Sequence, residues 1–144
     1  MTRPIPRPLM LGDIMKTEVY TVTADTDILV ATADLLERDI SGAPVIDEKG
    51  HVVAVLSKRD CLKAALNAYY HQDWSGKVSD YMVQPVQTMD VNTEIAAAAV
   101  GFINSRYRRF PITNNGLLMG QVSRTDVLKA LATHTLDTGD SQEY

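Results

Sequence analysis

Two short motifs in this chain place a serine and an aspartate at the same spacing. Ser57-Lys58-Arg59-Asp60 follows the apolar run at 52–56, and Ser123-Arg124-Thr125-Asp126 follows the apolar run at 118–122. Each run has the length of a buried strand, and the segment after each motif has the spacing of an amphipathic helix. Both motifs are therefore predicted at strand-to-helix junctions, where the first backbone N–H groups of the helix have no partner within it.

The residue types at these junctions suit the recognition of a nucleoside or a nucleotide. A carboxylate has two oxygens and can accept hydrogen bonds from both neighbouring hydroxyls of a ribose, a role open to Asp60 and Asp126. Ser57 and Ser123 stand where free helix N–H groups could hold a phosphate. The same Ser-x-x-Asp spacing also forms a capping box, in which both side chains only satisfy backbone N–H groups. From the motif alone, capping is the more common of the two roles.

A third candidate group is the basic and aromatic run Arg106-Tyr107-Arg108-Arg109-Phe110. Arg108 and Arg109 could each grip a phosphate through two parallel hydrogen bonds. Interleaved cations and aromatic rings also bind single-stranded nucleic acid, and cations near a helix C-terminus are favourable without any ligand. The formal net charge of -4 opposes a general role in binding nucleic acid or an anionic membrane. We therefore expect neither nucleic acid nor a membrane as a partner.

The composition predicts one ordinary globular domain. With 144 residues, of which 45% are hydrophobic and 22% charged, the chain can bury one core of usual size. The single Cys61 cannot form an internal disulfide, and it is expected to fill core space rather than sense redox state. Three scattered histidines give no metal-ligand spacing, so no metal is expected. No apolar stretch has the length of a signal peptide or a membrane span, so the expected location is the cytoplasm.

Most of the chain is a duplication. Ala43-Pro44-Val45-Ile46 corresponds to Phe110-Pro111-Ile112-Thr113, 67 positions later, whereas the two Ser-x-x-Asp motifs lie 66 positions apart. One residue is lost between these points, where Asp47-Glu48-Lys49-Gly50 corresponds to Asn114-Asn115-Gly116. Asn-Gly is a strong hairpin signal, and a hairpin loop tolerates such a change in length.

Periodicity within each copy predicts the order strand, helix, strand, strand, helix. Short strands are predicted at 19–22 and 86–89, and the helices after them are predicted to start at Asp25/Thr26 and at Asn92/Thr93. A hairpin follows in each copy, at 44–47 with 51–56 and at 110–113 with 117–122. The side chains expected on inner helix faces are Ile28, Ala31, Leu35 and Leu36, then Leu62, Ala65, Leu66 and Tyr69, then Ile95, Ala98, Ala99, Phe102 and Ile103, and finally Val127, Leu128 and Leu131.

These elements predict an α/β (α+β) fold made of two βαββα repeats. Residues 1–8 are expected to form an extended N-terminal arm, because prolines at 4, 6 and 8 disfavour helix. The first repeat spans 9–69, a linker spans 70–77, the second repeat spans 78–133, and an acidic flexible tail spans 134–144. A repeat of roughly 55 residues has little core of its own, so the two are expected to pack about a pseudo-twofold axis.

Two tandem copies of this order, each with Pro-apolar-apolar before a turn and an apolar strand ending in Ser-x-x-Asp, resemble the cystathionine β-synthase (CBS) domain pair, or Bateman module. The resemblance covers about residues 11–133. It implies a regulatory module that binds an adenosine-containing ligand, such as AMP, ADP, ATP or S-adenosylmethionine, between its repeats. It also implies a homodimer, and it requires no other cofactor.

The resemblance further implies that each site takes Ser-x-x-Asp from one repeat and the loop before the proline strand from the other. The first predicted site contains Ser57, Asp60, Gln87, Tyr107, Arg108 and Arg109. The second contains Tyr20, Ile40, Ser41, Ser123, Thr125 and Asp126. Because the arginines belong to the first, that site is expected to take a phosphorylated ligand, and the second is expected to take a less charged ligand or none.

The leading hypothesis is therefore a sensor of adenine nucleotides. Its ligand would bridge the repeats and change their geometry or that of a dimer, and an unknown effector protein would detect the change. The alternative is a ligand-free module that dimerises or docks onto another protein through exposed helices. An enzyme is the least favoured hypothesis, because the sequence contains no Walker loop, no nucleophile and base at motif spacing, and no cluster of metal ligands.

Overall fold

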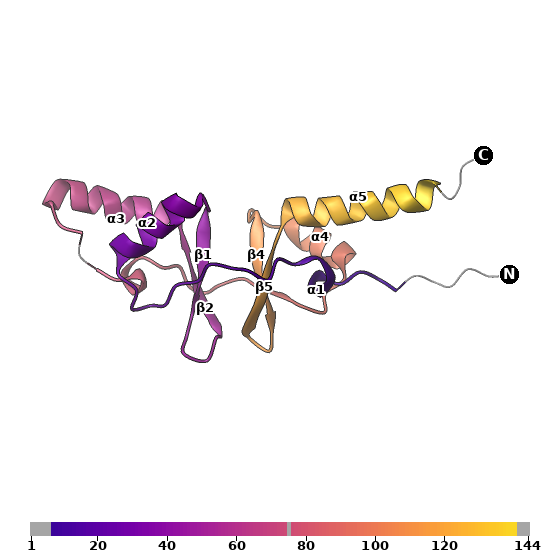
Figure 1. The fold of residues 1–144 in the computed structure, drawn as a ribbon, viewed down its shortest axis with the longest axis horizontal. Coiled ribbons are helices and arrows are strands. Elements are labelled where there is room, and N and C mark those ends of the chain that lie inside the picture. The colour runs from indigo at the N-terminus through magenta and orange to yellow at the C-terminus, as the bar shows by residue number, and fades with distance from the viewer. Residues whose placement is uncertain (1–6, 75, 141–144) are drawn as a thin grey trace. The chain divides into compact units, whose positions relative to one another are not determined.

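The computed structural model describes residues 7–74 and 76–140, which form two compact units. The first-repeat unit consists of Glu18–Gln87 together with Gly116–Leu118. The second-repeat unit consists of the chain up to Thr17, of Thr88–Asn115, and of the chain from Met119 onward. Within each unit two helices lie on one side of a β-hairpin, as Figure 1 shows. The predicted mixed α/β class, with two repeats of helices and strands, is confirmed.

The hairpins and the longer helices lie close to where the sequence predicts them. Strand and helix boundaries differ from the predictions by only a few residues for most elements. The elements in chain order are α1 (Leu11–Ile14), α2 (Ile28–Arg38), β1 (Gly42–Ile46), β2 (Val52–Ser57), α3 (Lys58–His71), the 3-10 helix η1 (Val78–Asp80), β3 (Met89–Asp90), α4 (Ile95–Ile103), β4 (Arg109–Asn114), β5 (Leu117–Ser123) and α5 (Arg124–Asp140).

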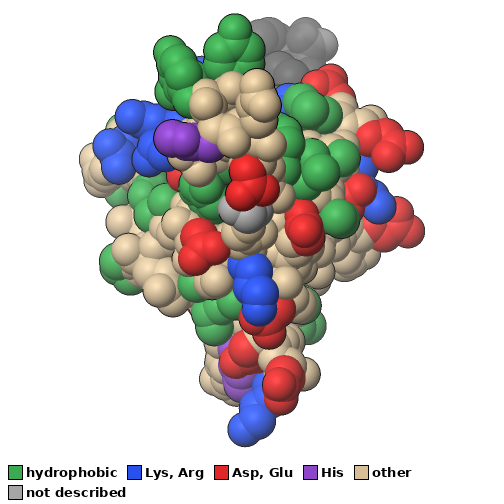
Figure 2. Space-filling view, turned by 90° about the vertical axis from the view of Figure 1, so that its left-hand side faces the viewer, with side chains coloured by type: hydrophobic (Ala, Val, Ile, Leu, Met, Phe, Trp, Pro, Cys, Tyr) green, Lys and Arg blue, Asp and Glu red, His purple; other side chains and the backbone are tan. Residues whose placement is uncertain are grey.

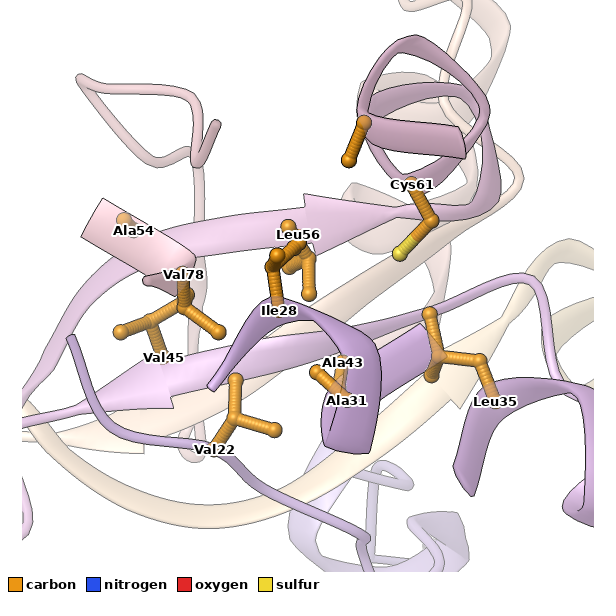
Figure 3. Packing of buried hydrophobic residues seen from close by; sticks show 11 residues of the cluster. Val22, Ile28, Ala31, Leu35, Ala43, Val45, Ala54, Leu56, Cys61 and Val78 are labelled. Carbon is orange, nitrogen blue, oxygen red and sulfur yellow. The ribbon is translucent and has the colours of Figure 1, made fainter. Parts of the chain in front are cut away.

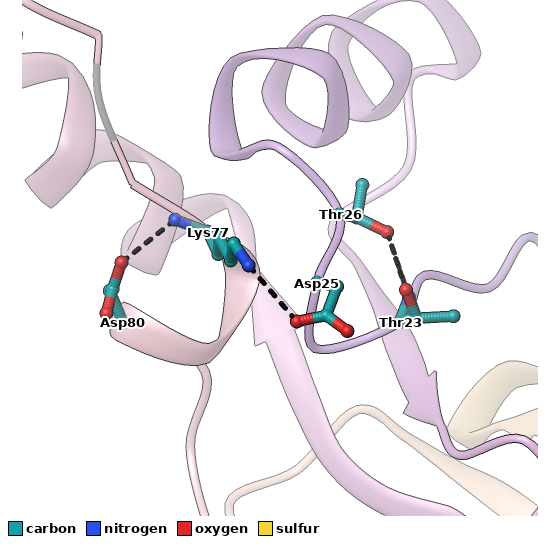
Figure 4. Close-up of polar contacts among 5 residues, drawn as sticks. All are labelled: Thr23, Asp25, Thr26, Lys77 and Asp80. Atoms are coloured by element: carbon teal, nitrogen blue, oxygen red, sulfur yellow. Dashed lines mark hydrogen bonds and ion pairs between the residues drawn. The ribbon is translucent and has the colours of Figure 1, made fainter.

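Helix α2 begins where Asp27 satisfies free N–H groups of the first turn. Its carboxylate accepts hydrogen bonds from two backbone N–H groups, at 2.8 and 3.4 Å. The predicted start at Asp25/Thr26 was wrong, because those side chains serve the preceding turn instead. The hydroxyls of Thr23 and Thr26 lie 3.1 Å apart, and Asp25 pairs with the Lys77 ammonium at 3.4 Å (Figure 4).

Strands β1 and β2 form an antiparallel hairpin in which Gly42 lies opposite Ser57. Its turn is closed by Asp47, whose carboxylate accepts two backbone N–H hydrogen bonds of 2.9 Å each. The strand predicted at 19–22 is reduced to one residue, because only Val22 makes a parallel bridge to β1. The hairpin is thus the main sheet of the first-repeat unit, and it presents Ser57 at the start of α3.

The core of the first-repeat unit lies between the hairpin and its two helices. Helix α3 faces this core with Cys61, Ala64 and Ala68, which are at most 4% exposed. Small side chains on this stripe allow the helix to approach the hairpin closely. The buried cluster, shown in Figure 3, consists of Val22, Ile28, Ala31, Leu35, Ala43, Val45, Ala54, Leu56, Cys61, Ala64 and Val78.

The predicted inner face of α3 was wrong. Leu62 is 68% exposed and Tyr69 is 79% exposed, and Leu66 is also exposed. Apolar residues occupy both sides of this helix, so apolar spacing alone could not identify the side that packs. The side with the smaller residues faces the core, since it fits against the hairpin. The same correction applies to single residues of the other helices, which are exposed: Leu36 in α2, Ile103 in α4 and Leu128 in α5.

In the second-repeat unit, β3, β4 and β5 form a three-stranded sheet with β3 parallel to β4. The ring of Phe102 in α4 packs on that of Phe110 in β4, with the ring centroids 4.9 Å apart. The predicted start of α4 at Asn92/Thr93 was wrong, because Glu94 is the N-cap residue, and its side chain makes no capping hydrogen bond. The buried cluster consists of Leu11, Ala98, Phe102, Phe110, Ile112, Val122 and Val127.

The second-repeat unit is completed by residues 9–16, which form the start of the first repeat in the sequence. Backbone hydrogen bonds of 2.8–3.0 Å join this segment to residues 91–95 and to Gln121. Leu11 is fully buried within the cluster of the second repeat. The fit is close at Gly12, where a Cβ atom would lie 2.8 Å from the side chain of Val91. The segment is therefore an integral part of the second-repeat unit.

Residues 76–83 complete the first repeat in the same manner. Val78 is fully buried, and its N–H donates to the carbonyl of Thr26 at 2.8 Å. Val83 exchanges two backbone hydrogen bonds with Val55 in β2. Each packed unit thus contains most of one sequence repeat plus the first residues of the other, so packed units and sequence repeats have different boundaries.

The predicted arm, linker and tail fall partly on residues that the structure does not describe. Of the arm at 1–8, only residues 7 and 8 are described, and residue 75 of the linker lies outside the described part. Helix α3 continues to His71 and α5 continues to Asp140. The predicted tail at 134–144 therefore overlaps α5, and its last four residues lie outside the described chain.

Truncating Leu11 tests the role of the N-terminal segment in the second-repeat core. We expect Leu11→Ala to lower the free energy of unfolding by about 3 kcal/mol, because it leaves a cavity in packed surroundings. Urea denaturation followed by circular dichroism measures this change. Met119→Ala, at a residue that is 40% exposed, is the control and should cost less than about 1 kcal/mol. Equal effects of the two variants would contradict the packing of residues 9–16 described above.

Candidate functional site

Ser57 and Asp60 form a closed capping box at the junction of β2 and α3. The Ser57 hydroxyl accepts a hydrogen bond from the Asp60 N–H at 3.1 Å. The Asp60 carboxylate accepts hydrogen bonds from the Ser57 N–H at 2.8 Å and from the Ser57 hydroxyl at 2.9 Å. Asp60 is 3% exposed. The first motif therefore stabilises the start of α3 with an acid that is buried and already hydrogen-bonded.

Ser123 and Asp126 form the corresponding pair between β5 and α5, in a more open setting. The Ser123 N–H donates to the Asp126 carboxylate at 2.9 Å, and the Asp126 N–H donates to the Ser123 hydroxyl at 3.1 Å. Asp126 is only half-buried and lines an open cavity of about 420 Å³. A volume of that order is typical of small-molecule sites. The other lining residues are Leu9, Ile14, Lys129, Ala130, Thr133 and His134, all within the second-repeat unit.

The loop before each proline strand lies against the Ser-x-x-Asp turn of its own repeat. The Lys58 N–H donates to the carbonyl of Ser41 at 2.8 Å, and the Arg124 N–H donates to the carbonyl of Arg108 at 2.8 Å. Within each unit, the Ser-x-x-Asp turn and the loop that contacts it therefore come from the same repeat. The predicted combinations across repeats join residues of different units, and they stay predictions.

Four exposed arginines lie in the loop before β4, at the start of β4 or at the start of α5. Arg106, Arg108 and Arg109 precede or begin β4, and Arg124 begins α5. Among the described residues, none of the four forms an ion pair. The Arg106 guanidinium lies 5.8 Å from the ring centroid of Tyr107, which is 38% exposed. Unpaired guanidinium groups near a helix N-terminus are suited to binding an anion.

Tyr20, predicted as a site residue, has partners within the first-repeat unit. Its hydroxyl donates to the Asp34 carboxylate at 2.6 Å, and the Arg38 guanidinium lies 4.5 Å from its ring centroid. Burial, and then the hydrogen bond to Asp34, raise the pKa of Tyr20 to about 12. These contacts attach the start of the repeat to helix α2.

The remaining predicted residues lie in different surroundings. Ile40 packs against the first-repeat core, whereas Ser41, Gln87 and Thr125 are exposed. Phe110, the last residue of the basic and aromatic run, is buried in the second-repeat core. Burial also raises the pKa of the Cys61 thiol, which keeps it protonated.

Comparison with known proteins decides the family. The family model of the CBS domain matches the chain twice, at residues 11–67 and 78–133. The chain belongs to the CBS domain family. The predicted resemblance is therefore confirmed, and the two matches correspond to the two sequence repeats.

Three relatives of this CBS pair are informative. An uncharacterized 17.7 kDa protein of Acidianus ambivalens is 33% identical over 135 residues, covering 92% of this chain and 80% of that protein. The uncharacterized protein MJ1225 of Methanocaldococcus jannaschii is 25% identical, and this chain spans 47% of its length. CBSX2, a CBS-pair protein of Arabidopsis thaliana, has been solved in complex with AMP. That complex matches with a TM-score of 0.75 at 26% identity, covering 88% of this chain and 98% of that one.

Most of the cavity lining in this CBS pair was not predicted. Lys129, Ala130 and Thr133 follow Asp126 by three, four and seven positions, which places them on one face of α5. That spacing could have predicted that these three residues lie on the same face of the helix as Asp126. Leu9 and Ile14 gave no such signal, because only tertiary packing brings them to α5.

Neither a metal-holding cluster nor a membrane-spanning helix is found among the described residues. Among them, no group of three or more histidines, cysteines, aspartates or glutamates is arranged to hold a metal ion. Within the same residues, no helix has the length and apolar character needed to cross a membrane.

Tyr20→Phe tests the contacts of Tyr20 in the folded CBS pair. Because the folded-state pKa is raised from 10.0 to about 12, the contribution of Tyr20 to stability is complete below pH 10 and is lost as pH rises towards 12. The difference in ultraviolet absorbance between wild type and Tyr20→Phe, titrated with base, should show one phenol ionising near pH 12. An ionisation near pH 10 would show that the Tyr20 hydroxyl does not donate a hydrogen bond to Asp34.

Proposed function

We propose that this CBS pair is a regulatory module that senses an adenine nucleotide, AMP, ADP or ATP, with S-adenosylmethionine as the alternative ligand. Membership of the CBS family supports the proposal, as does the similarity to CBSX2, which has been solved with AMP. In this proposal the module has no catalytic role. Ligand binding changes its conformation or its dimer, and an effector protein detects that change.

The observation that carries the proposal is the unequal setting of the two aspartates. Asp60 is buried and holds both the N–H and the hydroxyl of Ser57, whereas Asp126 faces an open cavity. A carboxylate in an open cavity can accept hydrogen bonds from both ribose hydroxyls at charge-assisted strength. Asp60 would first have to give up bonds within a buried cap, which costs free energy. We therefore assign the ribose to Asp126.

The phosphate groups are assigned to the start of α5. Arg108 lies in the loop that contacts Arg124, and neither arginine has an ion-pair partner among the described residues. The Ser123 hydroxyl can donate at the same helix end, where the helix dipole also favours an anion. This assignment differs from the sequence-based one, which expected the arginines to serve Asp60. It makes the Asp126 site the one that suits a charged ligand.

The combinations across repeats are kept as a separate proposal. One joins Ser57 and Asp60 with Gln87, Tyr107, Arg108 and Arg109, and the other joins Ser123, Thr125 and Asp126 with Tyr20, Ile40 and Ser41. In the first of these, Asp60 is the essential ribose ligand. This first combination and the assignment of the ribose to Asp126 therefore predict opposite effects for variants of Asp60 and Asp126.

We further propose that the module is a homodimer. Several large apolar side chains on α2 and α3 are exposed, which is unfavourable unless another surface covers them. Figure 2 shows hydrophobic side chains exposed beside charged ones on the face that it presents. A second copy of the chain is the proposed cover. The exposed apolar residues of these helices are Leu29, Val30, Leu36, Leu62, Leu66, Tyr69 and Tyr70.

The alternative function is a ligand-free assembly module, and the same exposed residues favour it. Such a module would dimerise or dock onto another protein without any small molecule. It differs from the sensor in one measurable respect, since its assembly would not respond to nucleotides. A titration with nucleotides therefore separates the two hypotheses.

Calorimetric titration with AMP, ADP, ATP and S-adenosylmethionine tests the sensor hypothesis. We expect at least one to bind in the micromolar range, and Asp126→Asn to weaken binding by roughly tenfold to a hundredfold, because charge-assisted hydrogen bonds are lost. Asp60→Asn is the matched control and should bind nearly as wild type. An effect confined to Asp60→Asn would support the assignment across repeats, and no binding below millimolar would exclude the sensor.

Sedimentation equilibrium tests the homodimer. Leu66→Glu places a charge among the exposed apolar side chains of α3 and should shift the protein from dimer to monomer. Leu117→Glu, at an exposed apolar position in the β4–β5 hairpin, is the control and should remain a dimer. A monomeric wild type, or an unchanged dimer in Leu66→Glu, would contradict the proposed interface.

A further inference from the structure

The outer sides of α2 and α3 form one surface, because both helices lie on the same side of the β1–β2 hairpin (Figure 1). We call this surface the first-repeat helix face. On α3 it carries Leu62, Leu66 and Tyr69, which follow one another at helical spacing and are exposed. On α2 it carries Leu29 and Leu36, which lie two turns apart and are also exposed. The face therefore has one apolar stripe on each helix.

Unpaired charges of both signs lie beside these stripes. Arg59 and Lys63 are one turn apart on α3, and Glu37 is the next-to-last residue of α2. All three side chains are exposed. Among the described residues, none of the three forms an ion pair. Charges of opposite sign without partners, next to exposed apolar side chains, are suited to an interface with a complementary surface.

The acid and the two cations lie towards the same end of the face. Asp39, directly after α2, pairs with Lys58, the first residue of α3, at 3.5 Å. The end of α2 and the start of α3 therefore lie together. Glu37 belongs to the last turn of α2, and Arg59 and Lys63 belong to the first two turns of α3.

We propose that the first-repeat helix face binds the same face of a second copy, with α2 of each copy antiparallel to α3 of the other. Glu37 then lies against the partner's Arg59 and the partner's Lys63. This inference rests on the homodimer proposed above. It adds which surfaces meet, in which orientation, and which charges fix that orientation.

A twofold axis parallel to the helices produces this arrangement. Rotation about such an axis places α2 opposite α3 of the other copy and keeps the charged ends together. In an isologous interface every contact occurs twice, so the acid of each copy meets the cations of the other. A twofold axis across the helices would instead place α2 opposite α2, and it would separate Glu37 from the cations by most of a helix length.

The helices of the second repeat are a poorer partner for this face. Helix α4 contains no charged residue, so the two cations of α3 would meet no acid on it. Among the side chains that the structure describes, the large exposed apolar ones of α4 and α5 are Val100, Ile103 and Leu128, fewer than those of α2 and α3. Pairing two first-repeat helix faces thus covers more apolar surface and pairs more charges.

Mixing two charge-reversed variants tests the arrangement. One variant is Glu37→Lys, and the other is Arg59→Glu/Lys63→Glu. Each alone should dimerise with a Kd at least about tenfold above that of wild type, because like charges then meet twice in each dimer. An equimolar mixture should dimerise within about threefold of wild type, because the heterodimer restores opposite charges at both contacts. Sedimentation velocity measures all three values.

Lys49→Glu is the control for the mixing experiment. It reverses an exposed cation in the β1–β2 turn, and its Kd should stay within about twofold of wild type. If wild type is a dimer but a charge-reversed variant dimerises equally well alone, or mixing restores nothing, the arrangement is wrong and the homodimer stands. If wild type is a monomer, the homodimer and this inference both fail.

The salt dependence of wild type tests the inference without any variant. Raising the ionic strength from about 0.05 to about 0.5 M screens exposed charges and should raise the dimer Kd about fivefold. An interface in which these charges have no partners would depend on apolar contacts alone. A dimer Kd that stays constant or falls with salt would therefore overturn the proposed charge pairing.

Discussion

The docking of residues 9–16 onto the second repeat is the constraint on which the candidate site depends. Leu11 is buried in the second-repeat core, and backbone hydrogen bonds on both sides of the segment fix its position. Without this segment, α5 would keep Asp126 but lose the apolar wall opposite it. Residues 76–83 complete the first repeat in an equivalent way. A repeat with too little core of its own is thus stabilised by a segment from elsewhere in the chain.

The two Ser-x-x-Asp motifs show how one local structure can serve different ends. In both, reciprocal hydrogen bonds between serine and aspartate stabilise the first turn of a helix. The surroundings then separate them. Asp60 is buried and receives an additional bond from the Ser57 hydroxyl, whereas Asp126 keeps access to a cavity. Capping and ligand binding are therefore not exclusive, since a capping acid retains acceptor capacity when solvent or ligand can reach it.

The sequence predicted features that depend on local periodicity and on duplication. The two hairpins, the four long helices and the family follow from alternating residues, the Asn-Gly turn and the repeated Ser-x-x-Asp. Prediction from the sequence failed where the outcome depended on tertiary packing. Both sides of α3 are apolar, and only packing selects Cys61, Ala64 and Ala68 over Leu62 and Tyr69. The cavity depended on Leu9 and Ile14 reaching α5, and no pattern within one repeat contains that contact.

The central claim is that Asp126, rather than Asp60, holds the ribose of an adenine nucleotide. A crystal structure of the protein grown with AMP tests it most directly. The account predicts both ribose hydroxyls within hydrogen-bonding distance of the Asp126 carboxylate and the phosphate near Arg108 and Arg124. A ribose bound to Asp60, or AMP bound away from both aspartates, would contradict it.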